Sequence, residues 1–142
     1  MLILMGRTAS GKTLVRDKLV KNHGFNSVVT YTTRPMRKDE IPDVTYHYIS
    51  EEDFSQKVES SFFAEWKKHI TTEGTWYYGS AKEDCKKADE NSVIILTPDG
   101  IRDIQKLGYD VTVIYLYSNI STINKRLVAR GDKKEEAERR IK

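Results

Sequence analysis

The sequence predicts an α/β protein in which an open parallel sheet carries helices on both faces. Two observations lead to this fold class. Short apolar runs alternate along the chain with segments whose apolar residues recur at helical spacing, which is the pattern of repeated strand–helix units. The run Val93–Leu96 contains no polar residue, as is typical of a parallel strand covered on both faces. At 142 residues, with 38% hydrophobic and 32% charged residues, the chain is sized for one domain with its own core.

Local patterns justify the individual elements. Strands are expected where runs are apolar, β-branched or aromatic, at residues 2–5, 28–31, 46–49, 62–66, 76–80, 93–96 and 111–116. The first and the last two of these are expected to be buried. Helices are expected from helical spacing and end signals at residues 14–23, 51–60, 82–91, 101–107, 120–130 and 135–142. Gly24 and Gly108 provide stop signals, and Ser50 before three acidic residues provides an N-cap. Residues 31–80 are rich in strands and are expected to form a subdomain outside the parallel sheet.

The segment Gly6–Thr13 has the spacing of a P-loop and follows a predicted strand. Glycines let successive backbone amides converge on an anion, and the following helix adds its positive N-terminus. Lys12 would reach the β- and γ-phosphates, and the Thr13 hydroxyl would bind Mg²⁺. A nucleoside triphosphate is therefore the predicted ligand, rather than the alternative of a glycine-rich turn that binds nothing. The residues expected to hold ATP are Gly6, Thr8, Ala9, Ser10, Gly11, Lys12, Thr13 and Leu14.

Composition excludes several classes of protein. No apolar run approaches the roughly 20 residues of a membrane span, and the start of the chain lacks the flanks of a signal peptide. Cys85 is the only cysteine, so an internal disulfide is impossible and a cytoplasmic location is expected. The net charge is +3, and residues 121–142 carry eight Lys/Arg and four acidic residues. A compact polyphosphate explains this basic segment better than nucleic acid, which would require a broad basic surface.

Outside the P-loop, three features suggest a second anion site. Arg34 and Arg37 lie three apart in a polar loop and could grip a phosphate, although two solvated arginines would look the same. Glu65 interrupts an apolar run and needs a partner unless it points to water. Arg126 and Arg130 share one helix face, where like charges repel unless an anion lies between them or solvent screens them.

Taken together, these segments resemble the guanylate kinase family over nearly the whole chain. The matching segments are Thr30 with Thr32–Pro35 and Arg37, Glu40, Tyr46, Phe63–Trp66, Tyr77–Ser80, Lys125–Gly131 and Arg139–Arg140. The resemblance implies a P-loop NTPase fold of three α/β/α layers, a small mixed-β GMP-binding subdomain and a helical lid. It assigns the core to residues 1–30 and 81–120, the GMP-binding subdomain to 31–80, and the lid with flanking helices to about 121–142.

The resemblance also implies an activity, the ATP-dependent phosphorylation of GMP and dGMP with Mg²⁺. The expected GMP ligands are Thr30, Arg34, Arg37, Tyr46, Glu65, Tyr78, Ser80 and Thr97. The expected catalytic groups are Lys12, Arg34, Arg126, Arg130 and Arg140, and the expected metal ligands are Thr13 and Asp99. A carboxylate such as Glu65 can accept two adjacent donors from guanine, a pair that adenine lacks.

The chain departs from the family in three places. Thr97 replaces the first acid of an Asp-x-Asp segment, extra residues occur within 69–74, and the chain stops where the family continues through another strand and helix. Two other functions therefore stay open. One is a non-catalytic module that binds phosphorylated peptides, although such modules generally lack an intact P-loop. The other is a related P-loop kinase with a different nucleotide or phosphosugar acceptor.

Overall fold

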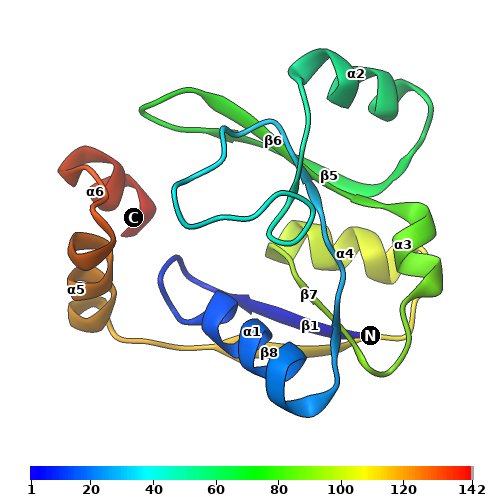
Figure 1. Cartoon of the computed structure of the whole chain (residues 1–142), viewed down its shortest axis with the longest axis horizontal. Helices are drawn as coiled ribbons and strands as arrows, with labels where there is room; N and C mark the ends of the chain where they lie inside the picture. The colour runs from blue at the N-terminus through cyan, green and yellow to red at the C-terminus, as the bar shows by residue number, and fades with distance from the viewer. Residues whose placement is uncertain (142) are drawn as a thin grey trace.

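The computed structural model describes residues 1–141, which form two sheets and six helices (Figure 1). The strands are β1 (Leu2–Gly6), β2 (Asn26–Ser27), β3 (Tyr31–Thr32), β4 (His47–Tyr48), β5 (Phe63–Ile70), β6 (Thr75–Ala81), β7 (Ser92–Ile95) and β8 (Thr112–Leu116). The helices are α1 (Lys12–His23), α2 (Glu51–Glu59), α3 (Lys82–Lys87), α4 (Pro98–Lys106), α5 (Ile120–Arg130) and α6 (Lys134–Ile141). Among the described residues, no helix is both long enough and apolar enough to cross a bilayer.

The first sheet is parallel and has the strand order β2-β7-β1-β8. Its two central strands supply the core, where Ile3 and Ile94 are almost fully buried. They pack with Ile101 and Ile104 of α4 on one face, while α1 lies against the other face (Figure 1). The predicted α/β class is confirmed.

The second sheet, here called the inserted sheet, has the order β4-β3-β6-β5. Its longest pair is the antiparallel β5–β6 hairpin, whose register runs from Phe63 opposite Ala81 to Ile70 opposite Thr75. Helix α2 begins after Ser50, whose side chain accepts a hydrogen bond from the Asp53 amide at 3.0 Å, as predicted from the N-cap pattern. In Figure 1 the tip of this hairpin points to the side of the molecule that α5 and α6 occupy.

Two predicted strands differ from the structure. The segment 111–116 does form a parallel strand, β8, but the prediction that it is buried is wrong, because residues 112–115 are exposed. In the described part of the chain this strand lies at the edge of the sheet and pairs with β1 alone. An apolar run by itself cannot distinguish an edge strand from a central one. The segment 28–31 is not one strand, because the chain passes there from β2 in the parallel sheet to β3 in the inserted sheet.

Helix α3 is shorter than the predicted helix at residues 82–91. It ends at Lys87, and Ala88 already has an extended backbone. Asp89 explains the early end, because its carboxylate accepts from the Asn91 amide at 2.9 Å while its own amide donates to the Ser92 hydroxyl at 3.0 Å. Such side-chain bonds to nearby backbone groups compete with a helix.

Candidate active site

The loop between β1 and α1 has a backbone that requires glycine. Gly11, at the N-cap of α1, has a φ of 103°, and Gly6 has a φ of 156°. A Cβ atom on Gly6 would lie 2.5 Å from the Leu116 carbonyl oxygen, so no larger residue fits between β1 and β8. The hydroxyl of Ser10 is buried in this loop and has no hydrogen-bond partner within residues 1–141. A curved loop at a helix N-terminus with an unsatisfied buried hydroxyl is suited to an anion.

Lys12 lies inside this curve. Its Nζ donates to the carbonyl oxygens of Gly6 at 2.7 Å and Arg7 at 2.6 Å, so the ammonium lies beneath the loop. Burial, and secondarily the charge of Arg130, lower the pKa of Lys12 from 10.5 to about 8. The helix begins at Lys12, two residues before the predicted start, and Thr13 and Leu14 are exposed on its first turn.

A second basic group lies in the loop after β3, centred on Arg34. Arg34 is 8% exposed and forms an ion pair with Glu40, with an Nη2–Oε1 distance of 2.7 Å. Its guanidinium also lies over the Tyr46 ring, 5.5 Å from the centroid. Burial acts to lower the pKa of Arg34, but the hydrogen bond and charge of Glu40, together with Tyr78, outweigh burial and raise it. Glu40 thus holds Arg34 charged and fixed in direction.

Glu65 is a buried carboxylate at the junction of the inserted sheet and α4. It is 8% exposed, and its Oε1 accepts a hydrogen bond from the fully buried Ser80 hydroxyl at 2.6 Å. A Cβ atom on Gly100 would lie 3.0 Å from the other oxygen, Oε2. Burial raises the pKa of Glu65, with Ser80 and then Lys67 opposing the rise. Oε2 therefore faces the start of α4, and among described side chains only Ser80 hydrogen-bonds the carboxylate.

Three other predicted site residues, Thr97, Asp99 and Thr30, have local partners. The hydroxyl of Thr97 is the N-cap of α4 and accepts from the Gly100 amide at 3.2 Å. Asp99 lies on the exposed first turn of α4, where its carboxylate contacts Arg102. Thr30 lies near the inserted sheet, where its carbonyl oxygen accepts from the His47 amide at 2.8 Å. Within residues 1–141, no group of three or more His, Cys, Asp or Glu side chains could hold a metal ion.

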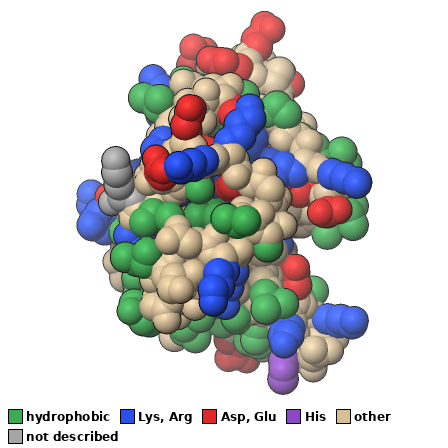
Figure 2. Space-filling view, turned by 90° about the vertical axis from the view of Figure 1, so that its left-hand side faces the viewer, with side chains coloured by type: hydrophobic (Ala, Val, Ile, Leu, Met, Phe, Trp, Pro, Cys, Tyr) green, Lys and Arg blue, Asp and Glu red, His purple; other side chains and the backbone are tan. Residues whose placement is uncertain are grey.

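The arginines of α5 and α6 reach back to the phosphate loop and to one another. Arg126 donates to the Ala9 carbonyl oxygen at 2.8 Å, and Arg7 donates to the carbonyl oxygen of Ile141. Arg130 binds Asp132 through two hydrogen bonds of 2.6 Å each. The Oδ2 atom of Asp132 also lies 3.7 Å from Nη1 of Arg140. Figure 2 shows the face that carries α5 and α6, where Lys and Arg side chains lie among acidic ones.

The basic groups of the three segments face one region of the molecule. The charge of Arg130 acts on Lys12 of the phosphate loop, and the charge of Arg34 acts on Arg130. Burial lowers the pKa of Arg37, and the charges of Arg34, Arg130 and Arg140 lower it further. The phosphate loop, the arginine loop and the C-terminal helices therefore present cations to a common space.

Sequence reasoning did not assign the carboxylates that bind these arginines, although Glu40 was among the residues that match the family. Glu40, Asp132 and Glu136 each bind at least one arginine and are largely buried. Glu40 also accepts a hydrogen bond from the Tyr48 hydroxyl. Burial is the larger cause, and this hydrogen bond the second, of a raised pKa of Tyr48. The one signal in the sequence was the closeness of Glu40 to Arg34, six positions apart, which favours an ion pair between them.

Not every hollow of the surface belongs to this region. An open hollow of about 720 Å³ lies between β4 and α2, lined by residues such as His47, Asp53 and Lys57. None of its lining residues is a predicted site residue.

A phosphate loop between a central parallel strand and its helix, facing an arginine loop on an inserted sheet, defines the class of P-loop nucleotide kinases. Comparison with known proteins gives the family. A family model described as guanylate kinase matches residues 1–141. The chain belongs to the guanylate kinase family.

Curated relatives agree with this membership. A guanylate kinase of Sulfurimonas denitrificans is 31% identical over 99% of this chain and 69% of its own length. A guanylate kinase of Wolinella succinogenes is 33% identical over 99% of this chain and 66% of its own length. The crystal structure of guanylate kinase from Anaplasma phagocytophilum matches the fold with a TM-score of 0.70 at 18% identity, covering 92% of this chain and 66% of that chain. The chain thus spans about two thirds of the length of these relatives. The membership supports guanylate kinase activity and favours neither alternative function.

Proposed function

We propose that this chain transfers the γ-phosphoryl group of ATP to the phosphate of GMP, with the two nucleotides bound on opposite sides of the common cationic space. The observation that carries the proposal is the position of Arg130, whose charge acts on Lys12 of the phosphate loop while Arg34 acts on it from the inserted sheet. Two polyanions can approach only where such charges neutralise them.

The phosphate loop fits ATP. The positive φ of Gly11 and the buried Ser10 hydroxyl, which has no partner among the described residues, favour the arrival of phosphate oxygens. Lys12 would exchange its hydrogen bonds to two loop carbonyls for bonds to these oxygens. Thr13 on the first turn of α1 would hold Mg²⁺, which needs only one or two protein ligands beside phosphates and water. When bound, the ion would neutralise charge on the transferring group. The assignment of Asp99 to the metal stays a prediction.

The inserted sheet would bind GMP. Arg34, Arg37, Tyr46 and Tyr78 would hold its phosphate, and Arg34 is already aimed by Glu40. Glu65 would read guanine through N1–H and the exocyclic amine, with Ser80 fixing one carboxylate oxygen. The burial that raises the pKa of Glu65 marks a cost that these two donors would offset, whereas AMP would leave the charge unpaired. Thr30 and Thr97 stay expected contacts.

In the proposed reaction, an oxygen of the GMP phosphate attacks the γ-phosphorus in line, and ADP leaves. No side-chain nucleophile is required. Lys12, Arg126, Arg130 and Arg140 would stabilise the charge on the equatorial oxygens, and approach of the inserted sheet and the α5–α6 pair would exclude water. This assigns the core to residues 1–30 and 81–120, GMP binding to 31–80, and closure to 121–142. A cytoplasmic location and independence from nucleic acid belong to the same proposal.

A coupled assay with ATP, Mg²⁺ and each of GMP, dGMP, AMP, CMP and UMP tests the proposal. We expect GMP to be strongly preferred, and Glu65→Gln to lower kcat/KM for GMP by about 100-fold, because an amide cannot accept both guanine donors. Glu59→Gln, on the exposed end of α2, is the matched control and should leave kcat/KM unchanged. ADP release with AMP but not with GMP would refute the role of Glu65.

A further inference from the structure

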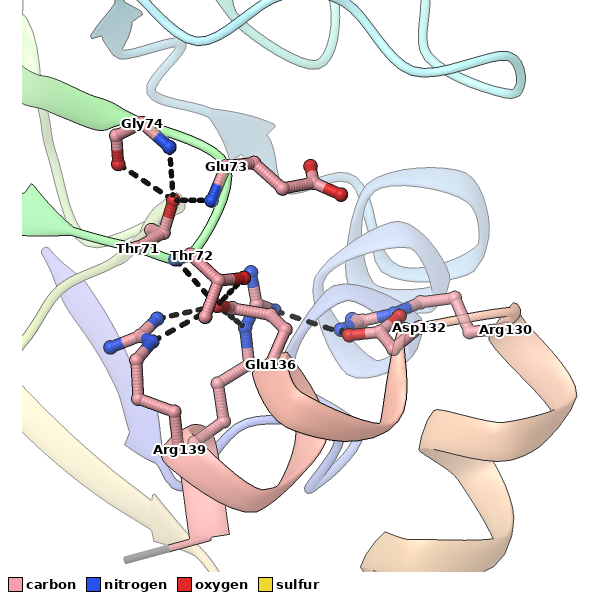
Figure 3. A network of polar contacts seen from close by, with 9 residues as sticks. Thr71, Thr72, Glu73, Gly74, Arg130, Asp132, Glu136 and Arg139 are labelled. Atoms are coloured by element: carbon pink, nitrogen blue, oxygen red, sulfur yellow. Dashed lines mark hydrogen bonds and ion pairs between the residues drawn. The ribbon is translucent and has the colours of Figure 1, made fainter.

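The tip of the β5–β6 hairpin contacts α6 through a single buried carboxylate. Glu136 is 6% exposed, and its Oε2 accepts from the backbone amide of Thr72 at 3.2 Å and from the Thr72 hydroxyl at 3.0 Å (Figure 3). The hairpin tip is itself ordered by Thr71, whose hydroxyl accepts from the Gly74 amide at 3.1 Å and donates to the Gly74 carbonyl at 2.7 Å. A fixed turn thus meets a fixed acceptor 64 positions away in the chain.

The same carboxylate binds two arginines of its own helix. Arg139 donates to Glu136 with Nε at 3.0 Å and Nη2 at 2.5 Å, and Arg140 donates with Nε at 2.7 Å. The hydrogen bonds from Arg139 are the main reason that the pKa of Glu136 lies far below its usual range. The bonds from Arg140 and Thr72 lower this pKa further. Glu136 is therefore charged throughout the working pH range and fully occupied.

An ion pair beside this contact is much more exposed. Lys133 and Glu73 approach to 3.2 Å, but their side chains are 74% and 56% exposed. Solvent screening makes such a pair worth little, whereas a buried carboxylate with several donors is costly to disrupt. Glu136, rather than this surface pair, carries the contact between the hairpin and α6.

The orientation of Arg140 depends on this contact. Arg140 lies between two carboxylates, Glu136 on one side and Asp132 at 3.7 Å on the other. Its charge acts on Arg37, a residue that the proposed function assigns to the GMP phosphate. Without Glu136, Arg140 would keep only Asp132 as a carboxylate partner among the described residues, while Glu40 would still offset the charge of Arg37. Repulsion from Arg37 and Arg130 would then push the arginines of α6 toward solvent.

We propose that Glu136 is a positioning residue for phosphoryl transfer, which docks α6 on the β5–β6 hairpin through Thr72 and thereby aims Arg140 at the space between the two nucleotides. The inference rests on the proposed function for the reaction that Arg140 serves, but the docking itself can be measured independently. It assigns a role to the hairpin tip, where the resemblance to the family predicts extra residues.

The experiment compares Glu136→Gln, Thr72→Val and Thr72→Ser with Glu135→Gln as the matched control on the exposed side of α6. For Glu136→Gln we expect kcat to fall by about tenfold or more, with KM for GMP changed by less than about threefold. Thr72→Val should lower kcat by about threefold, and Thr72→Ser should restore it because the serine hydroxyl can donate to the same oxygen. Glu135→Gln should match the unaltered chain.

His69 on β5 gives a readout of docking that does not depend on activity. Its ring packs on Tyr78 at 5.1 Å, and burial, followed by the charges of Arg139 and Arg140, lowers the pKa of His69. If Glu136 docks α6, Glu136→Gln should raise the His69 pKa toward 6.5 in an NMR titration, because the helix moves away. If α6 stays docked without Glu136, the two uncompensated arginines will lower that pKa further.

A lower His69 pKa, or an unchanged kcat in both Glu136→Gln and Thr72→Val, would overturn the proposal. Should Glu136→Gln fail to fold, the contrast between Thr72→Val and Thr72→Ser decides on kcat and on the His69 titration alike. If the unaltered chain phosphorylates no nucleotide, the proposed function fails, while the His69 titration still tests docking.

Discussion

Lys12 leads to a quantitative prediction about proton uptake on binding ATP. Because its pKa in the free protein is about 8, Lys12 is neutral in about a tenth of molecules at pH 7, half at pH 8 and nine tenths at pH 9. Phosphate oxygens beside Nζ would favour the charged form and restore a high pKa. ATP binding should therefore take up about 0.1, 0.5 and 0.9 protons at these three pH values.

The same linkage sets the affinity. If only the charged form of Lys12 binds, the Kd for ATP should rise about tenfold between pH 7 and pH 9. Isothermal titration with a non-hydrolysable ATP analogue and Mg²⁺, at pH 8 in two buffers of different ionisation enthalpy, gives the number of protons directly. Phosphates with a second pKa of about 6 are already ionised there and contribute little.

The control is Lys12→Arg, whose guanidinium stays charged at every pH used. Proton uptake should vanish in this variant even if its affinity is weaker. A wild-type chain that takes up no proton at pH 8, or a Lys12→Arg variant with undiminished uptake, would refute the reasoning.

The lowered pKa of Lys12 also affects stability. The pKa of 10.5 in the unfolded chain exceeds the pKa in the folded chain, so the unfolded chain binds more protons between pH 8 and 10.5. Through Lys12, the free energy of unfolding should rise with pH across that window.

Three further predictions use other contacts. Gly100→Ala places a Cβ 3.0 Å from a Glu65 oxygen, so kcat/KM for GMP should fall several-fold in the coupled assay while the Tm holds or rises. An unchanged kcat/KM for GMP would contradict this. Ser50→Ala removes the N-cap of α2 and should lower the free energy of unfolding in urea by about 1 kcal/mol. Ser55→Ala, at an exposed position inside α2, should not lower it, because alanine has the higher helix propensity. Burial raises the pKa of Cys85 to about 11, so its thiol should react with iodoacetamide at pH 8 only as fast as the chain opens.

Local signals in the sequence predicted local structure well. Gly24 ends α1 in the left-handed region and Ser50 caps α2, because each of these residues acts on backbone within its own turn. The alternation of apolar runs and helices was sufficient for the α/β class. Burial of β8 was not predictable, since it depends on which elements lie beside the strand.

The phosphate loop could be located from its spacing alone, but the partners of the arginines could not. Glu136 stands in a charged run next to Glu135, and no local feature separates the two. One is buried because α6 packs against a hairpin 64 positions earlier, and the other faces solvent. Contacts between residues so distant in sequence are decided by tertiary packing, on which propensity and periodicity carry no information.

The hydrogen bond from Arg126 to the Ala9 carbonyl ties α5 to the backbone of the phosphate loop. Binding free energies form closed thermodynamic cycles, so if occupation of the loop by nucleotide favours one placement of α5 and α6, that placement must tighten nucleotide binding by the same factor. Substitution of Thr72, in the turn between β5 and β6, should then change the affinity for ATP. The distance between Thr72 and the phosphate loop would not weaken that reciprocity.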